Sequence, residues 1–234
     1  MPRSLLHSTP CRAHLVLLHV LLHVIQRGVN RAAIFIDDED RHHYRLLLRE
    51  ACLENDIVVH AFVLMDNYAP LLLTPPRAEA LAVAMRAVGQ NYVQFFNHRD
   101  GRTGTLWQGG SKSCLAESDR YALMVCRYVE LNPVRTVMVA LSEERRGSSV
   151  HSRPCPLITL HLTRRALGAT WEEWAIEYGR WLRAGIEDEE ISKIRSYIAK
   201  ERAFGCTRFQ AMVEKALGLP AGWRNRGRPS SRSV

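Results

Sequence analysis

Residues 57–73 read IVVHAFVLMDNYAPLLL, and this stretch decides the fold. The part from Ile57 to Met65 is rich in β-branched and apolar side chains, which favours an extended strand. Asp66-Asn67 is a turn signal, and Leu71-Leu72-Leu73 then predicts a returning strand that Pro75-Pro76 ends. The stretch therefore predicts two neighbouring antiparallel strands.

The segments around this pair of strands add a strand and helices in a regular order. Residues 13–27 predict a strand, and residues 38–54 and 78–97 place apolar side chains at helical spacing. A short strand is expected within residues 100–116. A third helix should end near Asn132, because Pro133 disfavours a helical residue before it. This order predicts the α+β class, with an antiparallel sheet and helices on one face.

The chain beyond the third helix changes character. Residues 143–156 carry two prolines and a polar run, which predicts a linker after a first domain at 1–142. Residues 157–222 are helical in pattern throughout and predict a small all-α domain. Residues 223–234 carry four arginines and no acidic residue, which predicts a basic tail.

The composition of the 234 residues indicates the kind of partner. Lys and Arg total 32 against 24 Asp and Glu, which gives a net charge of +8 and a pI near 9.5. A basic balance attracts polyanions, of which nucleic acid is the commonest, although a basic surface kept only for solubility stays open.

The six cysteines form no CxxC pair, so the sequence signals neither a zinc site nor a disulfide framework. The apolar run from Leu15 to Ile25 is too short to cross a bilayer, and no small-residue cleavage site follows it. We expect a cytoplasmic protein with no membrane partner.

Tyr128 and Asn132 stand four residues apart in the third predicted helix, so they share one helical face. A tyrosine hydroxyl is able to attack a phosphodiester and form a phosphotyrosine, and an amide oxygen suits a hard cation such as Mg²⁺. A plain structural interpretation stays open, because tyrosines at helical spacing usually pack and asparagine before proline usually ends a helix.

The surrounding sequence, RYVELNPVR at 127–135, resembles the tyrosine motif of the REP-associated single-tyrosine transposases, which belong to the HUH family of single-strand nucleases. HVIQRG at 23–28, AFVLM at 61–65, LLLTP at 71–75 and GRTGTLW at 101–107 are similar to that family in the same order. The resemblance covers roughly residues 20–140. It implies a ferredoxin-like sheet, Tyr128 as the nucleophile, Mg²⁺ or Mn²⁺ as cofactor, and single-stranded or hairpin DNA as partner. Related enzymes act as monomers or as homodimers, and both remain open.

The chain departs from the family at the metal motif. The family places two histidines, one residue apart, on the strand after the turn, and they hold the cation together with the residue at Asn132. Tyr68 and Pro70 stand at the histidine positions here. Proline has no side-chain donor atom and a protonated tyrosine is a poor ligand, so loss of two ligands from three predicts weak metal binding.

Three residues near this motif are candidates for replacement ligands. Asp66 offers a carboxylate two residues before Tyr68, but it lies in the turn. His23 and His60 lie on predicted strands, and we expect both to be packed histidines rather than ligands.

Two more departures follow. Gly110 and Ser111 stand where the family commonly carries an arginine and an aromatic residue, which removes a phosphate contact and a stacking surface. Arg146-Gly147 stands where a proline-tryptophan pair is usual. Three departures in one domain suggest a copy decaying from an active enzyme, and an altered binding protein is the alternative.

Several basic or amide side chains are candidate DNA contacts, although each one alone is more often a solvated surface group. They are Arg27, Asn30, Arg31, Arg86, Arg99, Arg102, Lys112 and Arg135. In the tail, Arg226-Gly227-Arg228-Pro229 resembles the core of an AT-hook, in which arginines enter a narrow minor groove, and a chance basic tail is the equal alternative.

Three hypotheses follow. The first is a transposase-like protein that cuts and rejoins single-stranded DNA through Tyr128 but is impaired by loss of the metal-binding histidines. The second is a non-catalytic DNA-binding protein derived from such a transposase. The third, an interaction protein with no nucleic-acid role, requires the basic charge and the ordered motif matches to be coincidence.

Overall fold

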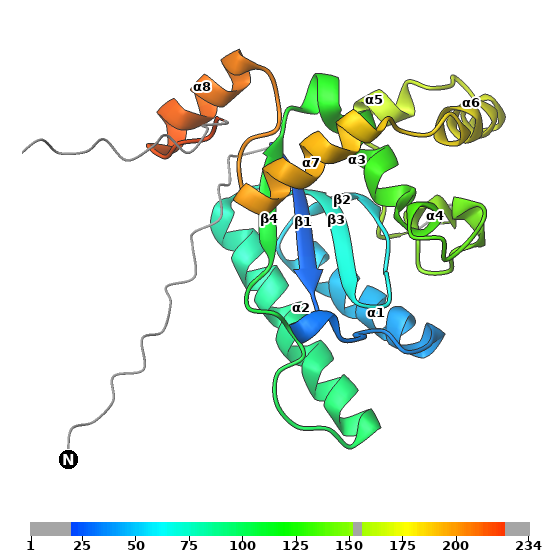
Figure 1. The fold of residues 1–234 in the computed structure, drawn as a ribbon, viewed down its shortest axis with the longest axis vertical. Coiled ribbons are helices and arrows are strands. Elements are labelled where there is room, and N and C mark those ends of the chain that lie inside the picture. Colours follow the sequence, from blue (N-terminus) through cyan, green and yellow to red (C-terminus); the bar gives the residue numbers. More distant parts are fainter. Residues whose placement is uncertain (1–19, 152–155, 223–234) are drawn as a thin grey trace, which may run out of the picture.

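The computed structural model describes residues 20–151 and 156–222, and its centre is a four-stranded antiparallel sheet (Figure 1). The strands are β1 (Leu21–Arg27), β2 (Val58–Phe62), β3 (Tyr68–Thr74) and β4 (Lys112–Ala116). They lie in the order β2-β3-β1-β4, so the predicted pair of neighbouring strands is β2 and β3. The part of the predicted 13–27 strand up to residue 19 lies outside the described residues.

Helices cover both faces of this sheet. The helices that do so are α1 (Asp38–Glu54), α2 (Ala78–Asp100), α3 (Ser118–Glu130) and α7 (Asp188–Lys200). Side chains alternate along each strand, so Leu22 and Val24 pack under α1 and α2 while Leu21 packs with α3 and α7. The predicted α+β class, with two helices on one face of an antiparallel sheet, is confirmed. The second helical layer on the opposite face was not predicted.

The start of α1 follows from its first residues. Asp37 caps the helix by accepting from the backbone N–H of Asp40, and the Asp40 carboxylate accepts in return from the backbone of Asp37. Asp40 is fully buried, and Arg99 from the end of α2 neutralises it at 2.8 Å. Local capping therefore also ties α1 to α2.

The predicted third helix is followed directly by a second, short helix that was not predicted. Helix α3 stops at Glu130, and a separate short helix, α4 (Asn132–Arg135), begins immediately after it. Pro133 lies in the first turn of α4, where its missing N–H would have had no helical partner. The proline therefore starts a new turn rather than ending helical structure.

The remaining elements lie mostly in the second half of the chain. They are η1 (Val29–Arg31), η2 (Ser142–Glu144), η3 (Ser149–His151), α5 (Leu162–Arg165), α6 (Trp171–Arg183) and α8 (Thr207–Leu217). None of the helices within 20–151 and 156–222 is long and apolar enough to span a bilayer.

The segment predicted as a small helical domain at 157–222 shares its core with the sheet. Phe204 donates its backbone N–H to Leu115 of β4 at 2.7 Å, and Thr159 donates to Val59 of β2 at 2.8 Å. Ala203, Phe209 and Val213 pack into the same cluster as α1 and α2, and α7 packs on the opposite face. The division at 143–156 stays a prediction, and we propose that 157–222 is an extension that depends on the sheet for its own packing.

A steric prediction arises at Gly28, which follows β1 directly. A Cβ at this position would lie 2.3 Å from the carbonyl oxygen of Ala32 and 2.7 Å from Cγ2 of Ile34. We expect Gly28→Ala to lower the free energy of unfolding, measured in urea, by about 1–3 kcal/mol because backbone must shift. The control is Gly179→Ala within α6, where φ is not positive and the nearest atoms belong to the flexible end of the Arg183 side chain at 3.3 Å. Equal losses in both variants would show that the close approach at Gly28 is unimportant.

Candidate nucleic-acid interface at Tyr128

Tyr128 lies in the last turn of α3 and packs against the sheet with only 6% of its surface exposed. The edge of its ring meets the buried ring of His23 from β1, with centroids 5.6 Å apart. The guanidinium of Arg135 lies 4.3 Å from the Tyr128 centroid and also donates to the Tyr128 carbonyl at 2.7 Å. Packing and a cation–π contact therefore hold this side chain in one place.

Asn132, the first residue of α4, lies beside Tyr128 and is buried. Its amide oxygen accepts from the Tyr68 hydroxyl at 3.2 Å and from the Arg135 guanidinium at 2.6 Å. The Arg135 guanidinium sets the orientation of the amide, because it only donates and the opposite orientation would bring NH₂ against it. Both acceptor sites of the amide oxygen are thus in use.

The residues at this position do not fit a divalent cation. Burial, together with nearby Tyr128, raises the pKa of Tyr68, so its phenol stays a proton donor. Pro70 has no donor atom, and Asp66 is bound by Arg41 at 2.6 Å and Arg145 at 2.8 Å. Across the described part of the chain, no group of three or more histidine, cysteine or acidic side chains could hold a metal.

The two strand histidines are packed, as the sequence led us to expect. His60 makes hydrogen bonds through both ring nitrogens, to the Thr159 carbonyl and the Thr74 hydroxyl, each at 2.9 Å. His23 is fully buried, and neither of its ring nitrogens has a hydrogen-bond partner. Burial lowers the pKa of His23 to about 3 and that of His60 to about 4, so both are neutral.

These depressed pKa values predict acid sensitivity. The unfolded chain binds protons on both histidines below pH 6.5 while the folded chain does not, so stability is lost as the pH falls from 6.5 towards 4. We expect a slope of about 1.4 kcal/mol per pH unit for each histidine, measured by urea unfolding at several pH values. His23→Leu should remove one of the two contributions. An unchanged slope in that variant would contradict the buried neutral state of His23.

The candidate DNA contacts fall into separate groups. The strand register puts Arg27 and Lys112 on the sheet face that carries Tyr128, and Arg27 lies over the Tyr68 ring at 5.3 Å. Arg135 joins them through its contacts with Tyr128 and Asn132. The exposed residues Asn30 and Arg31 lie on η1, just beyond the end of β1.

The other candidates lie elsewhere. Arg86 is exposed on α2, and Arg102 lies over the ring of Phe96 at 5.4 Å. Arg99 forms ion pairs with Asp37, Asp40 and Asp100, so its charge is already neutralised within the fold. Arg226 and Arg228 lie outside the described residues.

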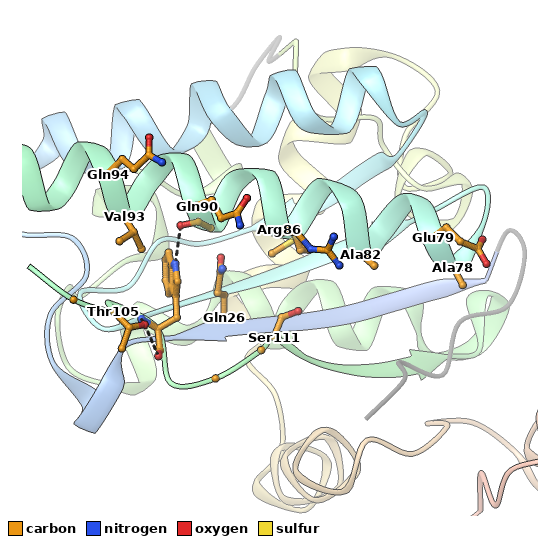
Figure 2. Close-up of a pocket in the computed structure, with 16 residues that line it drawn as sticks. Gln26, Ala78, Glu79, Ala82, Arg86, Gln90, Val93, Gln94, Thr105 and Ser111 are labelled. Atoms are coloured by element: carbon orange, nitrogen blue, oxygen red, sulfur yellow. Dashed lines mark hydrogen bonds between the residues drawn. The ribbon is translucent and has the colours of Figure 1, made fainter. Parts of the chain in front are cut away.

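A groove of about 1040 Å³ runs between α2 and the segment that leads into β4 (Figure 2). Gln26, Arg86 and Gln90 line it from β1 and α2, and Gly110 and Ser111 line it from the opposite wall. Gln26 points to the α1 and α2 side of the sheet, where it accepts from the Tyr44 hydroxyl. The groove therefore lies on the face away from Tyr128, and Gly110 and Ser111 give its wall no large side chain at these two positions.

Sequence reasoning missed two features around this site. Glu130 forms a fully buried ion pair with Arg164 of α5 at 3.0 Å, which no local pattern indicates because the partners are far apart in sequence. Arg195 of α7 lines a cleft together with Arg135. No local pattern singles out Arg195, because the same segment begins with the acidic run at 187–190, which would repel phosphate.

Comparisons with known proteins bear on the family and the fold. The family model described as IS200-like transposase matches residues 17–132, whereas no curated protein sequence matches the chain. A solved structure of a REP-associated tyrosine transposase bound to a REP hairpin is similar over 66% of this chain and 90% of its own. The identity is 15% and the TM-score is 0.51, which supports the fold.

A candidate transposase from Deinococcus radiodurans R1 is 21% identical over 52% of this chain and 95% of its own, with a TM-score of 0.37. The family assignment does not depend on this second structure. It depends on the family match, which includes both Tyr128 and Asn132, and on the shared fold. Through residues 17–132, this chain belongs to the family of IS200-like transposases.

Proposed function

We propose that this chain is a DNA-binding protein of transposase descent, which holds single-stranded or hairpin DNA at the Tyr128 face and lacks metal-assisted cleavage. The observation that carries the proposal is the hydrogen bond from the Tyr68 hydroxyl to Asn132 Oδ1. A phenol stands where the resemblance expects a histidine ligand, and it occupies the amide oxygen that would remain for a cation.

The DNA-binding half of the proposal rests on charge and family. The net charge of +8 favours a polyanion, and Arg27 and Arg135 on the Tyr128 face have no carboxylate within ion-pair distance in the described residues. The REP-associated transposase of similar fold is bound to a REP hairpin. We extend that ligand class, hairpin DNA, to this chain as part of the proposal.

A second candidate is the cleavage and rejoining of single strands. Tyr128 favours it, because a tyrosine hydroxyl is able to attack a phosphodiester and the Arg135 guanidinium supplies positive charge beside the ring. In that reaction Tyr128 Oη would form a bond to phosphorus, the bond from phosphorus to the 3′ oxygen would break, and a 3′ hydroxyl would leave.

One experiment separates these functions. Labelled single-stranded hairpin DNA from the gene's own flanks is titrated with the native chain in EDTA and in Mn²⁺, and adducts are sought on denaturing gels. We expect binding that is equal in both conditions and weakens steeply with salt, without an adduct. An adduct that Tyr128→Phe abolishes would establish the cutting enzyme, and absence of salt-dependent binding would end the DNA-binding proposal.

A further inference from the structure

Part of the C-terminal extension, residues 157–222, lies on the same face of the sheet as Tyr128. Helix α7 crosses that face beside β4 (Figure 1), and its Ile191, Ile194 and Ile198 pack in one cluster with Tyr128 and, at its margin, Tyr68. An amphipathic helix that buries three isoleucines in this cluster has a defined position over the tyrosine site. Its polar residues at the edge of the cluster therefore also have defined neighbours.

Arg127 connects this extension to α3, the helix that carries Tyr128. Its guanidinium donates to the carbonyl of Gly185, in the turn between α6 and α7, at 2.6 Å. It also lies 4.1 Å from the centroid of Trp181 on α6. Because Arg127 directly precedes Tyr128 on α3, the start of α7 is held at a fixed place relative to the nucleophile candidate.

Arg195 follows the buried Ile191 by one helical turn and is exposed. It lines a cleft of about 530 Å³ with Arg135, Arg183 and the carboxylates of Glu143 and Asp188. Arg183 lies 4.0 Å from Glu143, so these two charges offset each other. The one other carboxylate that lines this cleft is that of Asp188, at the first residue of α7. It forms no ion pair with Arg195 or Arg135.

Arg27 from β1 lies over the Tyr68 ring and Arg135 from α4 lies over the Tyr128 ring. Arg195 from α7 lines the cleft beside Arg135, and its charge acts on Tyr68. None of the three has a carboxylate within 4.0 Å among the residues that the structure describes. Two nitrogens of the Arg135 guanidinium are buried without a hydrogen-bond partner. Guanidinium groups that lack a paired carboxylate and lie beside one cluster favour an anion, and a phosphate of a DNA backbone is such an anion.

We propose that Arg195 on α7 completes a phosphate-binding site beside Tyr128, so that the C-terminal extension contacts the backbone of single-stranded DNA. The proposal rests on the proposed DNA-binding function and adds a residue and a segment to it. Arg195 and Arg27 have exposed side chains, whereas Arg135 is partly buried beside Tyr128.

The test is a salt series of hairpin DNA binding in EDTA by the full chain. We expect Arg195→Ala to weaken binding by about tenfold and to reduce the slope of log affinity against log salt by about 0.7. Arg195→Lys should restore most of the slope. The matched control is Arg208→Ala, which removes an exposed arginine from α8 of the same extension. Equal effects of Arg195→Ala and Arg208→Ala would overturn the inference.

Two further arms separate the remaining outcomes. At equal ionic strength, inorganic phosphate should displace DNA from the native chain better than chloride, and Arg195→Ala should reduce this difference. If phosphate displaces DNA selectively but Arg195→Ala leaves the DNA affinity unchanged, Arg195 does not contact the DNA backbone and the inference is overturned. If the native chain binds no DNA at all, the proposed function itself fails, whereas native binding that is indifferent to Arg195 refutes only the present inference. An unchanged melting temperature in Arg195→Ala excludes loss of folding as the cause.

Discussion

Replacement of Arg164 by methionine is expected to lower the free energy of unfolding by about 3–5 kcal/mol, because it leaves the Glu130 carboxylate buried without its counter-charge. Both side chains are almost completely inaccessible, with 2% of Arg164 and none of Glu130 exposed. Arg164 also donates to the carbonyl of His60 on β2 at 3.0 Å. A single guanidinium therefore joins the extension to the tyrosine helix and to the sheet.

The neighbours of this ion pair explain why water is unable to replace the lost partner. The Arg164 guanidinium lies 4.3 Å from the ring centroid of Tyr178 and 5.6 Å from that of Trp174. The Ser149 hydroxyl donates to the same Glu130 oxygen and accepts from the backbone N–H of Phe62. In the Arg164→Met variant, the Glu130 carboxylate remains enclosed by aromatic and backbone groups, so its negative charge stays desolvated.

Urea unfolding of single and double variants tests this prediction. Glu130→Leu combined with Arg164→Met removes both charges, and we expect it to recover most of the loss seen in Arg164→Met alone. Arg180→Met is the control, because its partner Glu177 forms an exposed pair with side chains 70% and 44% accessible. We expect it to change stability by less than about 0.5 kcal/mol. A small effect of Arg164→Met, equal to that of the control, would show that the pair is not essential.

The combined variant Tyr68→His, Pro70→His is expected to bind Mn²⁺ at least about 100-fold more tightly than the native chain. Side chains two residues apart on a strand point to the same face, so both imidazoles would face Asn132. Removal of the Tyr68 phenol also frees one acceptor site of the Asn132 oxygen. Imidazole nitrogen and amide oxygen together form a donor set that suits Mn²⁺.

The backbone of β3 should accept these two changes. The Val63 N–H donates to the Pro70 carbonyl at 3.2 Å, and proline has no N–H with which to return the bond. Histidine at position 70 supplies that missing N–H. We therefore expect the repaired chain to melt at or above the temperature of the native chain.

Titration calorimetry with Mn²⁺ measures the predicted gain. The control variant is Tyr68→Phe, Pro70→Ala, which frees Asn132 without the addition of ligands and should bind no more Mn²⁺ than the native chain. Equal Mn²⁺ binding by the native and repaired chains would contradict our description of the metal motif. If only the Tyr68→His, Pro70→His variant forms an adduct with DNA, and Tyr128→Phe abolishes that adduct, the chain has kept both its DNA-binding surface and its nucleophile.

Local sequence determined the main elements of the sheet half. The turn at Asp66-Asn67, the β-branched run before it and the apolar spacing of α1 and α2 are all short-range signals, and the structure confirms each one. The absence of the histidine pair was equally visible in the sequence. These features depend on residues within one or two turns of one another, so a linear pattern contains them.

Only the tertiary structure decided how the second half of the chain is used. The sequence suggested a small helical domain beyond residue 156, and that division stays a prediction. The structure adds that α7 packs on the face of the sheet that carries Tyr128, and that Arg164 pairs with Glu130, 34 positions earlier in the chain. The sequence likewise offered Arg99 as one candidate DNA contact, and the folded chain pairs it with three aspartates. A linear pattern shows that a charge exists, but its partner is set by long-range packing. For that reason the environment of Tyr128, with Arg135 on one element and Arg195 on another, became apparent only once the chain was folded.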